Sequence, residues 1–465
     1  MSFIILIYFI FLISKFITCS LIKIPFIVEN YNKVKNPQII DKYLYKDIIV
    51  KLYAGTPEQE VQLSACLGEY TTFIISKDAE GYDYGIYNKN KSNTFKVLEN
   101  ENPEFYIFQT FSEGIKSKDN IRIKNYDKID NYEFVLATEF GMNNCYSLYC
   151  ETLNQPGILG FLISQNPNQM QENVTNTNFI SQLKKRSLIS DYFFTFHFNS
   201  ENSGNIIIGM RPDDYDNKTY KEDDYFPIKT SIGGRAYLDW SIEFDEIIYG
   251  NITMKYNEPI LLRIEYGLIN GFYEWNDYLK SEFFDELIEK KKCFVDYTSN
   301  IEYASSTKYY YCNKDVDLNK FKPFVFSLHQ YDYNFTFTKD DLFINVGDKY
   351  LFLIVFNSMP GIFGYPFFKK YQPVFNQDTK TIGFYRYIKN IPKSSSSSNS
   401  NTAYYIAIII LGILLIALII FVIIFYIKGF RKPKKNANEL TNENSQYEYD
   451  DMNKKSLVDD ENNVN

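Results

Sequence analysis

The chain has 465 residues and a formal net charge of −8. That length is sufficient for two sizeable hydrophobic cores. The acidic balance leaves no basic stripe along the chain, which argues against nucleic acid as a partner. Tyr and Phe occur 41 and 40 times, so a single aromatic match to a short motif carries little weight.

Both ends of the chain carry apolar segments. Residues 1–20 form an apolar block that ends in small residues, which predicts a signal peptide cleaved before Leu21, with an uncleaved anchor as the alternative. Residues 404–427 carry no charge and would span about 36 Å as a helix, which predicts a transmembrane helix. Five Lys and Arg residues follow within 428–435, which places that side in the cytoplasm. We therefore predict a single-pass type I membrane protein.

The segments around the predicted membrane helix are polar. Residues 389–403 form a Ser-rich linker, and residues 428–465 form a tail whose composition predicts disorder. "YDDM", from Tyr449 to Met452, fits a tyrosine-based sorting signal that a cytoplasmic adaptor would bind, although such short matches arise readily by chance. The ectodomain would lie outside the cell or in the lumen of an endomembrane compartment, and the sequence does not decide between them.

Modification motifs agree with this topology. All N-x-[ST] sequons precede the predicted membrane helix, and they give the glycosylation candidates Asn90, Asn173, Asn217, Asn251 and Asn334. Cys19 would leave with the signal peptide, so five cysteines remain, and in an oxidising compartment one thiol stays unpaired. Proximity in the sequence favours disulfides Cys145–Cys150 and Cys293–Cys312, which leaves Cys66 free. No metal cluster or nucleotide fingerprint is present, and no cofactor is predicted.

The ectodomain is predicted to be mainly β. Short aromatic or β-branched runs alternate with polar and Gly-rich turns, as in residues 46–54, 104–111, 193–199 and 205–210. Amphipathic helices are few, and the clearest are predicted at residues 276–292 and 178–189. "QPGILGFLISQ" (155–165) and "MPGIFGYPFFKKY" (359–371) share P-G-I-[LF]-G-[FY] and follow two candidate strand-turn sites at similar distances. This repetition favours a duplicated, two-lobed fold over chance.

Several blocks of the sequence resemble the pepsin-like aspartic peptidase family. The resemblance is carried, in order, by "KDIIVKLYAGTPEQEVQLSA", "PGILGF", "FFTFHFNSENSGNIIIGMRPDDY", "YLDWSIEFDEIIYGN" and "PGIFGYPFFKKYQPVFNQDTKTIGFYR". It implies two lobes, an N-lobe at 43–190 and a C-lobe at 191–388, with a peptide-binding cleft between them. "LIKIPF", within the N-terminal segment 21–42, resembles the start of a family propeptide strand, and a propeptide there would be much shortened. The family also often has a disulfide where Cys293 and Cys312 lie.

The resemblance implies a catalytic loop of the type Asp-[TS]-Gly in each lobe. Two close carboxyl groups then share a proton, and the ionised one activates a water molecule. In this sequence the two loops read Cys66-Leu67-Gly68-Glu69 and Glu265-Tyr266-Gly267-Leu268, and no D-[ST]-G occurs anywhere. The loop glycines Gly68 and Gly267 are retained, which we attribute to the backbone turn, where a Cβ would clash. Both catalytic aspartates and the supporting hydroxyl groups are replaced.

The replacements argue against the usual chemistry. A thiol with a reference pKa near 8.5 is neutral at acidic pH and cannot substitute for a carboxylate. Glu265 keeps its charge, but its longer side chain moves the carboxyl group by roughly an ångström, which can reduce the rate about 100-fold. The predicted flap, within residues 104–114, aligns Ile107 with the family's tyrosine, and a shift of one residue would place Tyr106 there instead.

Two other chemistries could use these positions. Cys66 as a nucleophile would require a base, and the chain has only His197 and His329. A new acid pair of Glu69 and Glu265 would require Glu69 to reach back past its own turn. The prediction is therefore a membrane-anchored, peptidase-like ectodomain that binds a peptide or protein without cleaving it. An active aspartic endopeptidase with atypical residues is the alternative, and a surface protein that uses the fold only as a scaffold is a third possibility.

Overall fold

The structure is a computed structural model that describes residues 21–30, 38–80, 87–98, 104–107, 110–126, 128–140, 157–163, 178–231, 239–256, 258–298 and 306–387. By internal contacts the chain divides into residues 1–390 and 391–465, and every described element belongs to the first unit. No described helix is long and apolar enough to cross a membrane. The predicted signal peptide, linker, membrane helix, tail, Asn173, Cys145, Cys150, Tyr449 and Met452 lie outside the described residues.

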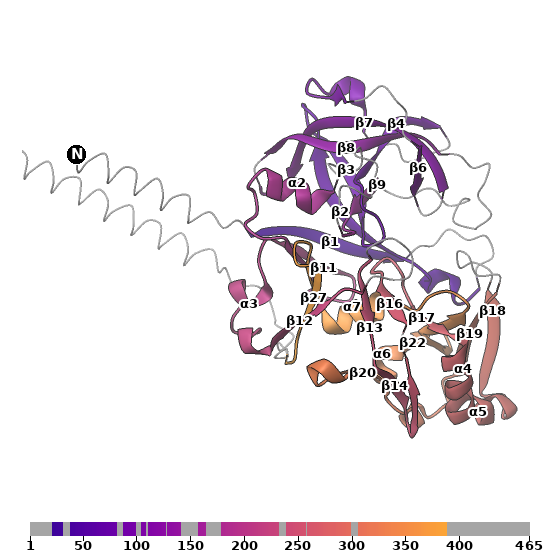
Figure 1. Ribbon diagram of the computed structural model, residues 1–465. Coiled ribbons are helices and arrows are strands. Elements are labelled where there is room, and N and C mark those ends of the chain that lie inside the picture. The colour runs from indigo at the N-terminus through magenta and orange to yellow at the C-terminus, as the bar shows by residue number, and fades with distance from the viewer. Residues whose placement is uncertain are drawn as a thin grey trace, which may run out of the picture. The chain divides into compact units, whose positions relative to one another are not determined.

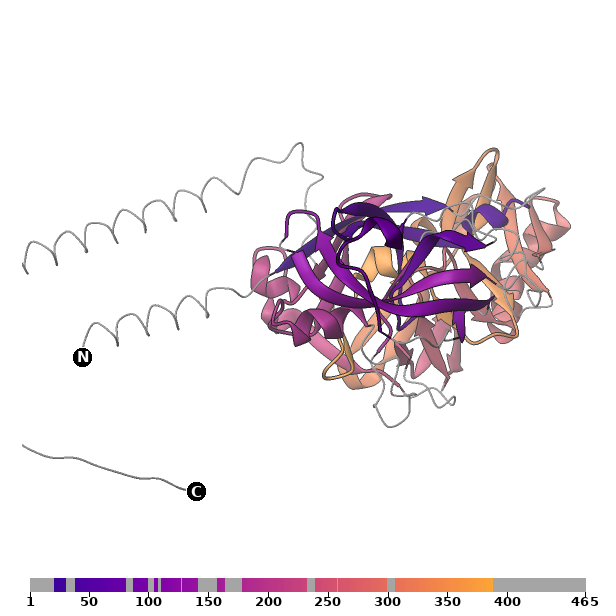
Figure 2. The ribbon, with the colours of Figure 1, turned by 90° about the horizontal axis from the view of Figure 1, so that it is seen from above.

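The largest sheet has 14 strands and draws on both halves of the chain (Figure 1). Its strands are β1 (Ile22–Asn30), β2 (Lys46–Ala54), β3 (Gln59–Cys66), β4 (Phe73–Glu80), β5 (Lys96–Val97), β6 (Glu104–Ile107), β7 (Thr110–Ile123), β8 (Lys128–Phe140), β9 (Gly157–Gly160), β10 (Phe193–Phe198), β11 (Ser203–Ile208), β12 (Tyr225–Lys229), β26 (Val374–Asn376) and β27 (Thr381–Tyr385). We use N-lobe for β2–β9, which lie above β1 in Figure 1 and face the viewer in Figure 2.

The second half of the chain forms two further sheets, which lie below β1 in Figure 1. The nine-stranded sheet contains β13 (Ser241–Glu243), β16 (Pro259–Leu262), β17 (Ile269–Phe272), β18 (Cys293–Thr298), β19 (Thr307–Asn313), β22 (Phe343–Val346), β23 (Lys349–Phe352), β24 (Ile354–Asn357) and β25 (Ile362–Phe363). The four-stranded sheet contains β14 (Glu246–Tyr249), β15 (Ile252–Lys255), β20 (Phe324–Leu328) and β21 (Tyr333–Phe337). We use C-lobe for β13–β25. The mainly β prediction is confirmed.

Described helices are short, as the sequence predicts. They are α2 (Phe179–Lys185), α3 (Pro212–Tyr215), α4 (Tyr273–Leu279), α5 (Asp285–Glu289), α6 (Lys339–Leu342) and α7 (Tyr365–Tyr371). A π-helical turn, Lys280–Phe284, joins α4 to α5, so the helix expected at 276–292 runs from 273 to 289. The side chain of Asn178 caps α2 by accepting a hydrogen bond from the Ser181 amide at 3.0 Å, because the first amides of a helix lack partners within it.

One predicted strand is wrong. The run at 104–111 reads as a single strand by composition, but it is divided between β6 and β7, which pair antiparallel with Ile107 opposite Thr110. The hairpin lies where the flap was expected. The side chains of Tyr106 and Ile107 are not described, so the choice between them as the flap residue stays a prediction.

Strand β1 lies inside the largest sheet. It pairs with β11 on one side, from Ile22 opposite Ile208 onward, and with β2 on the other. Its burial alternates strictly, with Ile22, Ile24, Phe26 and Val28 buried. A half-buried strand has this period of two. The segment that resembles a propeptide therefore contributes one row of side chains to the core.

The repeated Pro-Gly-Ile motif has the same structural role in both halves. β9, from the first copy, runs parallel to β3 and places Gly160 beside Cys66. β25, from the second copy, runs parallel to β16 and pairs Phe363 with Leu262. In each half the motif therefore supports the strand that leads into a predicted catalytic loop. This equivalence is what the duplication predicted from the two motifs requires.

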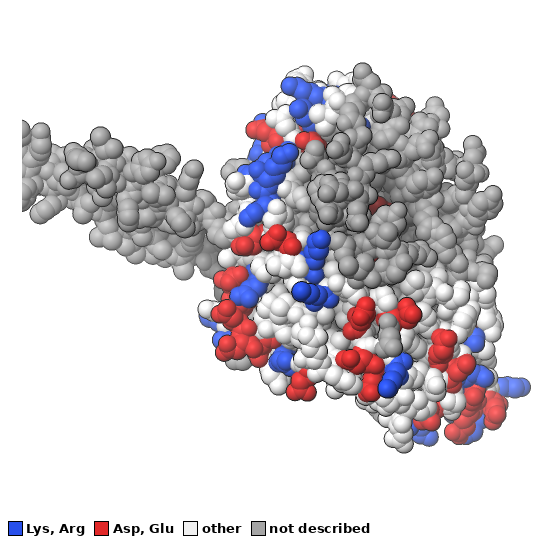
Figure 3. All heavy atoms as spheres, viewed as in Figure 1, with Lys and Arg blue, Asp and Glu red and all other residues white. Residues whose placement is uncertain are grey.

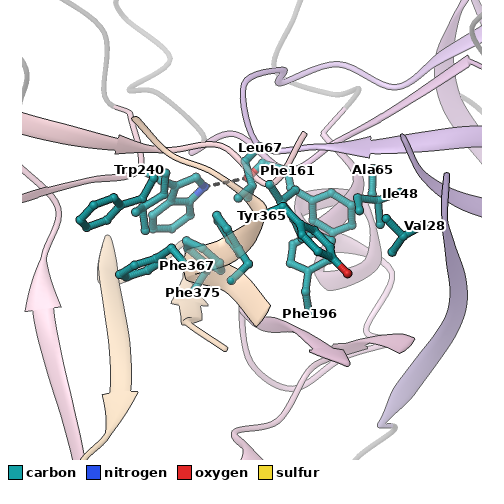
Figure 4. Close-up of a cluster of buried hydrophobic side chains, with 14 of the residues drawn as sticks. Val28, Ile48, Ala65, Leu67, Phe161, Phe196, Trp240, Tyr365, Phe367 and Phe375 are labelled. Atoms are coloured by element: carbon teal, nitrogen blue, oxygen red, sulfur yellow. Dashed lines mark hydrogen bonds between the residues drawn. The ribbon is translucent and has the colours of Figure 1, made fainter. Parts of the chain in front are cut away.

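Aromatic side chains fill the core that both lobes share (Figure 4). Trp240 of the C-lobe half donates a hydrogen bond of 2.9 Å from its indole N–H to the carbonyl oxygen of Phe161. A buried indole N–H requires such a partner. Phe194 and Phe375 stack with ring centroids 4.9 Å apart. The halves are thus joined by packing as well as by the shared sheet.

Candidate functional site

The two predicted loops meet in the structure. Cys66 ends β3 and is fully buried, and its thiol interacts with the carboxyl group of Glu265, in the loop between β16 and β17. Glu265 has only 5% of its surface exposed. The predicted alignment requires these side chains to face each other across the lobes, and they do so.

Both carboxyl oxygens of Glu265 are engaged by the opposite loop. The Leu67 amide donates to Oε2 at 3.2 Å, and the Gly68 amide donates to Oε1 at 3.1 Å. A carboxylate that accepts backbone N–H bonds in this way is held in place by charge-assisted hydrogen bonds.

An arginine that sequence reasoning did not single out completes the site. Nε of Arg263 lies 3.7 Å from Oε1 of Glu265, and Nη2 donates to Oδ2 of Asp239 at 2.6 Å. Arg263 is largely buried, with 12% of its side chain exposed. The sequence did contain a signal, because Arg263 interrupts the apolar run "PILLRIE", and a charge in such a strand requires a partner.

Burial governs the ionisation of this cluster. It raises the pKa of Glu265, and the neighbouring Arg263 guanidinium offsets part of that effect. Burial, followed by the charge of Glu265, raises the pKa of the Cys66 thiol well above its ordinary value. Burial alone would lower the pKa of Arg263, but Asp239 and Glu265 raise it on balance. Cys66 is therefore a neutral thiol and Arg263 a fixed cation.

Neither histidine of the chain serves as a base for the thiol. Nδ1 of His197 lies 3.2 Å from the hydroxyl oxygen of Tyr220, and Nε2 of His329 lies 3.5 Å from Oε2 of Glu246. Both histidines are thus occupied elsewhere in the structure. Nucleophilic catalysis by cysteine requires a thiolate and an adjacent base. Among the described residues Cys66 adjoins the Glu265 carboxyl group and no histidine, and its raised pKa keeps the thiol protonated, so the thiolate is not formed.

The two loop glycines lie so close to neighbouring atoms that a side chain would not fit. A Cβ on Gly68 would lie 2.8 Å from Oε1 of Glu265 and 3.0 Å from Nε of Arg263. A Cβ on Gly267 would lie 1.9 Å from the carbonyl oxygen of Tyr43. Neither glycine is among the described residues with a left-handed backbone. The clash of a Cβ expected from the sequence is therefore present at both turns, and lack of space, not a left-handed backbone, is the reason that glycine is needed.

The segment preceding β2 holds the C-lobe loop from its other side. We call residues 38–45 the N-terminal strap. The Leu44 carbonyl accepts a hydrogen bond from the Gly267 amide at 2.8 Å, and the next residue beyond the strap, Lys46, donates its amide to the Glu265 carbonyl at 2.9 Å. The Tyr45 and Tyr266 rings pack edge to face, 5.2 Å apart. The C-lobe loop therefore lies between this strap and the N-lobe loop.

The other predicted site residues are placed as follows. Cys293 and Cys312 form the predicted disulfide, which joins β18 to β19, and Cys66 is a free thiol. The described sequon residues Asn90, Asn217, Asn251 and Asn334 are all exposed. No group of residues that could hold a metal ion occurs in the described part of the chain.

Comparison with known proteins agrees with this architecture. No curated protein matches the sequence. Residues 48–386 match the family described as eukaryotic aspartyl protease, a span that begins in β2 and ends just after β27. It includes the paired loops, both Pro-Gly-Ile motifs and the closing strands. The chain belongs to the eukaryotic aspartyl protease family.

Proposed function

We propose that this protein binds an extended peptide or protein segment between its lobes and does not cleave it. One observation carries the proposal: the position of one catalytic acid is occupied by a buried neutral thiol, and the other acid is committed to the amides of Leu67 and Gly68. Proteolysis in this family requires two carboxyl groups that share one proton around a water molecule. The binding surface is independent of those acids, so binding can outlast catalysis.

Binding without cleavage is tested with the full-length protein in detergent. The protein is incubated with a diverse peptide library from pH 3 to pH 7, with and without a peptide-like inhibitor that mimics the transition state. We expect intact peptides to be retained and displaced by the inhibitor, with no new termini detected by mass spectrometry. Cleavage that the inhibitor blocks, and that Glu265→Ala abolishes, would establish an active endopeptidase instead. Failure to retain any peptide would favour a scaffold role.

We further propose that the domain is the ectodomain of a single-pass type I glycoprotein, anchored by residues 404–427. The support is the uncharged segment, the cationic residues that follow it, and the exposure of the four described sequon asparagines. On the face drawn in Figure 3, acidic and basic side chains are interspersed, so the described part of that face offers no uniformly charged patch for a membrane surface or nucleic acid.

The topology is tested in intact cells that express the chain with a C-terminal epitope. External protease should leave the epitope intact, and a glycosidase should shift the mass of the protein. Asn217→Gln, at an exposed sequon outside the sheets, should remove one glycan-sized step. An epitope that is digested in intact cells would reverse the proposed orientation. Release by alkaline carbonate would contradict the membrane helix.

A further inference from the structure

The retained acid of the site makes its contacts across the lobes. Glu265 belongs to the C-lobe, yet both of its carboxyl oxygens accept hydrogen bonds from the N-lobe loop, at 3.2 Å from the Leu67 amide and 3.1 Å from the Gly68 amide. The group is almost fully buried. Hydrogen bonds to a charged group in such surroundings are stronger than those between neutral groups. The carboxylate is therefore a direct connection between the two halves of the site.

Arg263 holds this carboxylate in place. Its guanidinium lies between two acids, 3.7 Å from the Glu265 carboxylate and 2.6 Å from that of Asp239. The three charges alternate in sign along a row that is buried at Glu265 and partly exposed at Arg263 and Asp239, which offsets the desolvation of the buried end. Gly68 completes the arrangement, because a side chain there would displace both Glu265 and Arg263.

We propose that Glu265 is a latch that locks the N-lobe loop to the C-lobe loop, and that Arg263 is its positioning residue. This proposal adds to the loss of catalysis, because it gives the remaining acid a structural role, which is to hold the two loops together. The carboxylate that would otherwise face a water molecule instead bonds the two loops to each other. This part rests on the proposed function: a peptide that binds between the lobes meets two loops whose spacing is already fixed.

Hydrogen–deuterium exchange at single-residue resolution tests the latch in the full-length protein without any ligand. Glu265→Ala should accelerate exchange of the Leu67 and Gly68 amides by roughly 10- to 100-fold, because each amide loses a charged acceptor. Arg263→Met should also accelerate both amides, although the carboxylate is still present. Glu265→Gln, which retains one neutral acceptor oxygen, should give a smaller increase and provides the test if the alanine variant does not fold.

A matched control separates the latch from general destabilisation. Arg211 also pairs with acids, namely Asp213, Asp214 and Glu222, but it lies at the start of α3. Arg211→Met should leave exchange at Leu67 and Gly68 unchanged. The latch is refuted if Glu265→Ala or Glu265→Gln leaves both amides at the wild-type rate, or if Arg211→Met accelerates them as much as Arg263→Met. Peptide cleavage is not measured here, so failure of the latch is distinguishable from failure of the proposed function.

Discussion

The role of the N-terminal strand can be tested by substitution within β1. Ile24 and Ile27 have the same side chain in the same strand, but Ile24 is 1% exposed and Ile27 is 44% exposed. Ile24 lies in the row that faces the core, and its neighbour in the sheet, Ile206, is also buried. If β1 belongs to the mature protein, we expect the side chain of Ile24 to stabilise the folded state and that of Ile27 to contribute little.

The expected magnitude follows from this burial. Truncating a buried Ile to Ala typically lowers the free energy of unfolding by about 2–5 kcal/mol, since it removes buried methyl groups and leaves a cavity. The same truncation at Ile27 should change the free energy of unfolding by no more than about 0.5 kcal/mol. The difference between the two variants is therefore roughly 1.5–5 kcal/mol.

Urea unfolding of the purified full-length protein, followed by tryptophan fluorescence, measures this difference. The chain has two tryptophans, Trp240 and Trp275, and both are buried in the main core. N-terminal sequencing of the same preparation should find a chain that starts at Leu21. The reasoning is refuted if Ile24→Ala and Ile27→Ala unfold at the same urea concentration. It is also refuted if the mature protein starts after Asn30 and remains folded, as removal of a propeptide would predict.

Three further predictions concern stability. Gly267→Ala should destabilise the protein far more than Gly68→Ala, as measured by thermal unfolding, because a Cβ at Gly267 meets a backbone carbonyl at 1.9 Å whereas at Gly68 it meets only side-chain tips; equal shifts would contradict this. Cys312→Ser should lower the free energy of unfolding by about 2–4 kcal/mol relative to the oxidised wild type. Relative to the reduced wild type, which lacks the same disulfide, the variant should differ little, and a large difference there would contradict the disulfide as the cause. Burial lowers the pKa of Lys46 to about 8, so the folded state loses this proton before the unfolded state does. Stability should therefore rise between about pH 8 and pH 10, and a rise of the same size in Lys46→Met would rule out Lys46 as its source.

Much of the fold was predictable because its signals are local or repeated. The two Pro-Gly-Ile motifs predicted a duplicated architecture, and both copies support the strand before a loop, at Cys66 and at Leu262. The disulfide between Cys293 and Cys312 followed from their proximity in the sequence and the family resemblance, and the structure confirms it. Residues 104–111 were misread because a tight hairpin of uniformly β-forming residues has the composition of one strand.

The contacts of the site were less predictable, because they join residues far apart in the sequence. The motif alignment identified Cys66 and Glu265, but it could not show that Glu265 reaches the amides of the opposite loop. Nor could it show that the strap approaches Gly267 so closely that a side chain is excluded. Such contacts depend on how the two loops are positioned in space relative to each other, and the residue types alone do not determine that position.

The position of β1 has a consequence for the order of folding during synthesis. β1, the first described strand, pairs with β11, so Ile22 cannot pair with Ile208 until the chain has been synthesised that far. The same sheet is completed only by β27, which ends at Tyr385. Pairings of such long sequence separation form slowly and leave strand edges exposed in the meantime. The nascent domain therefore stays incomplete until almost all of it has been translated. An N-terminal fragment that ends before β11 would lack the partner of its own first strand.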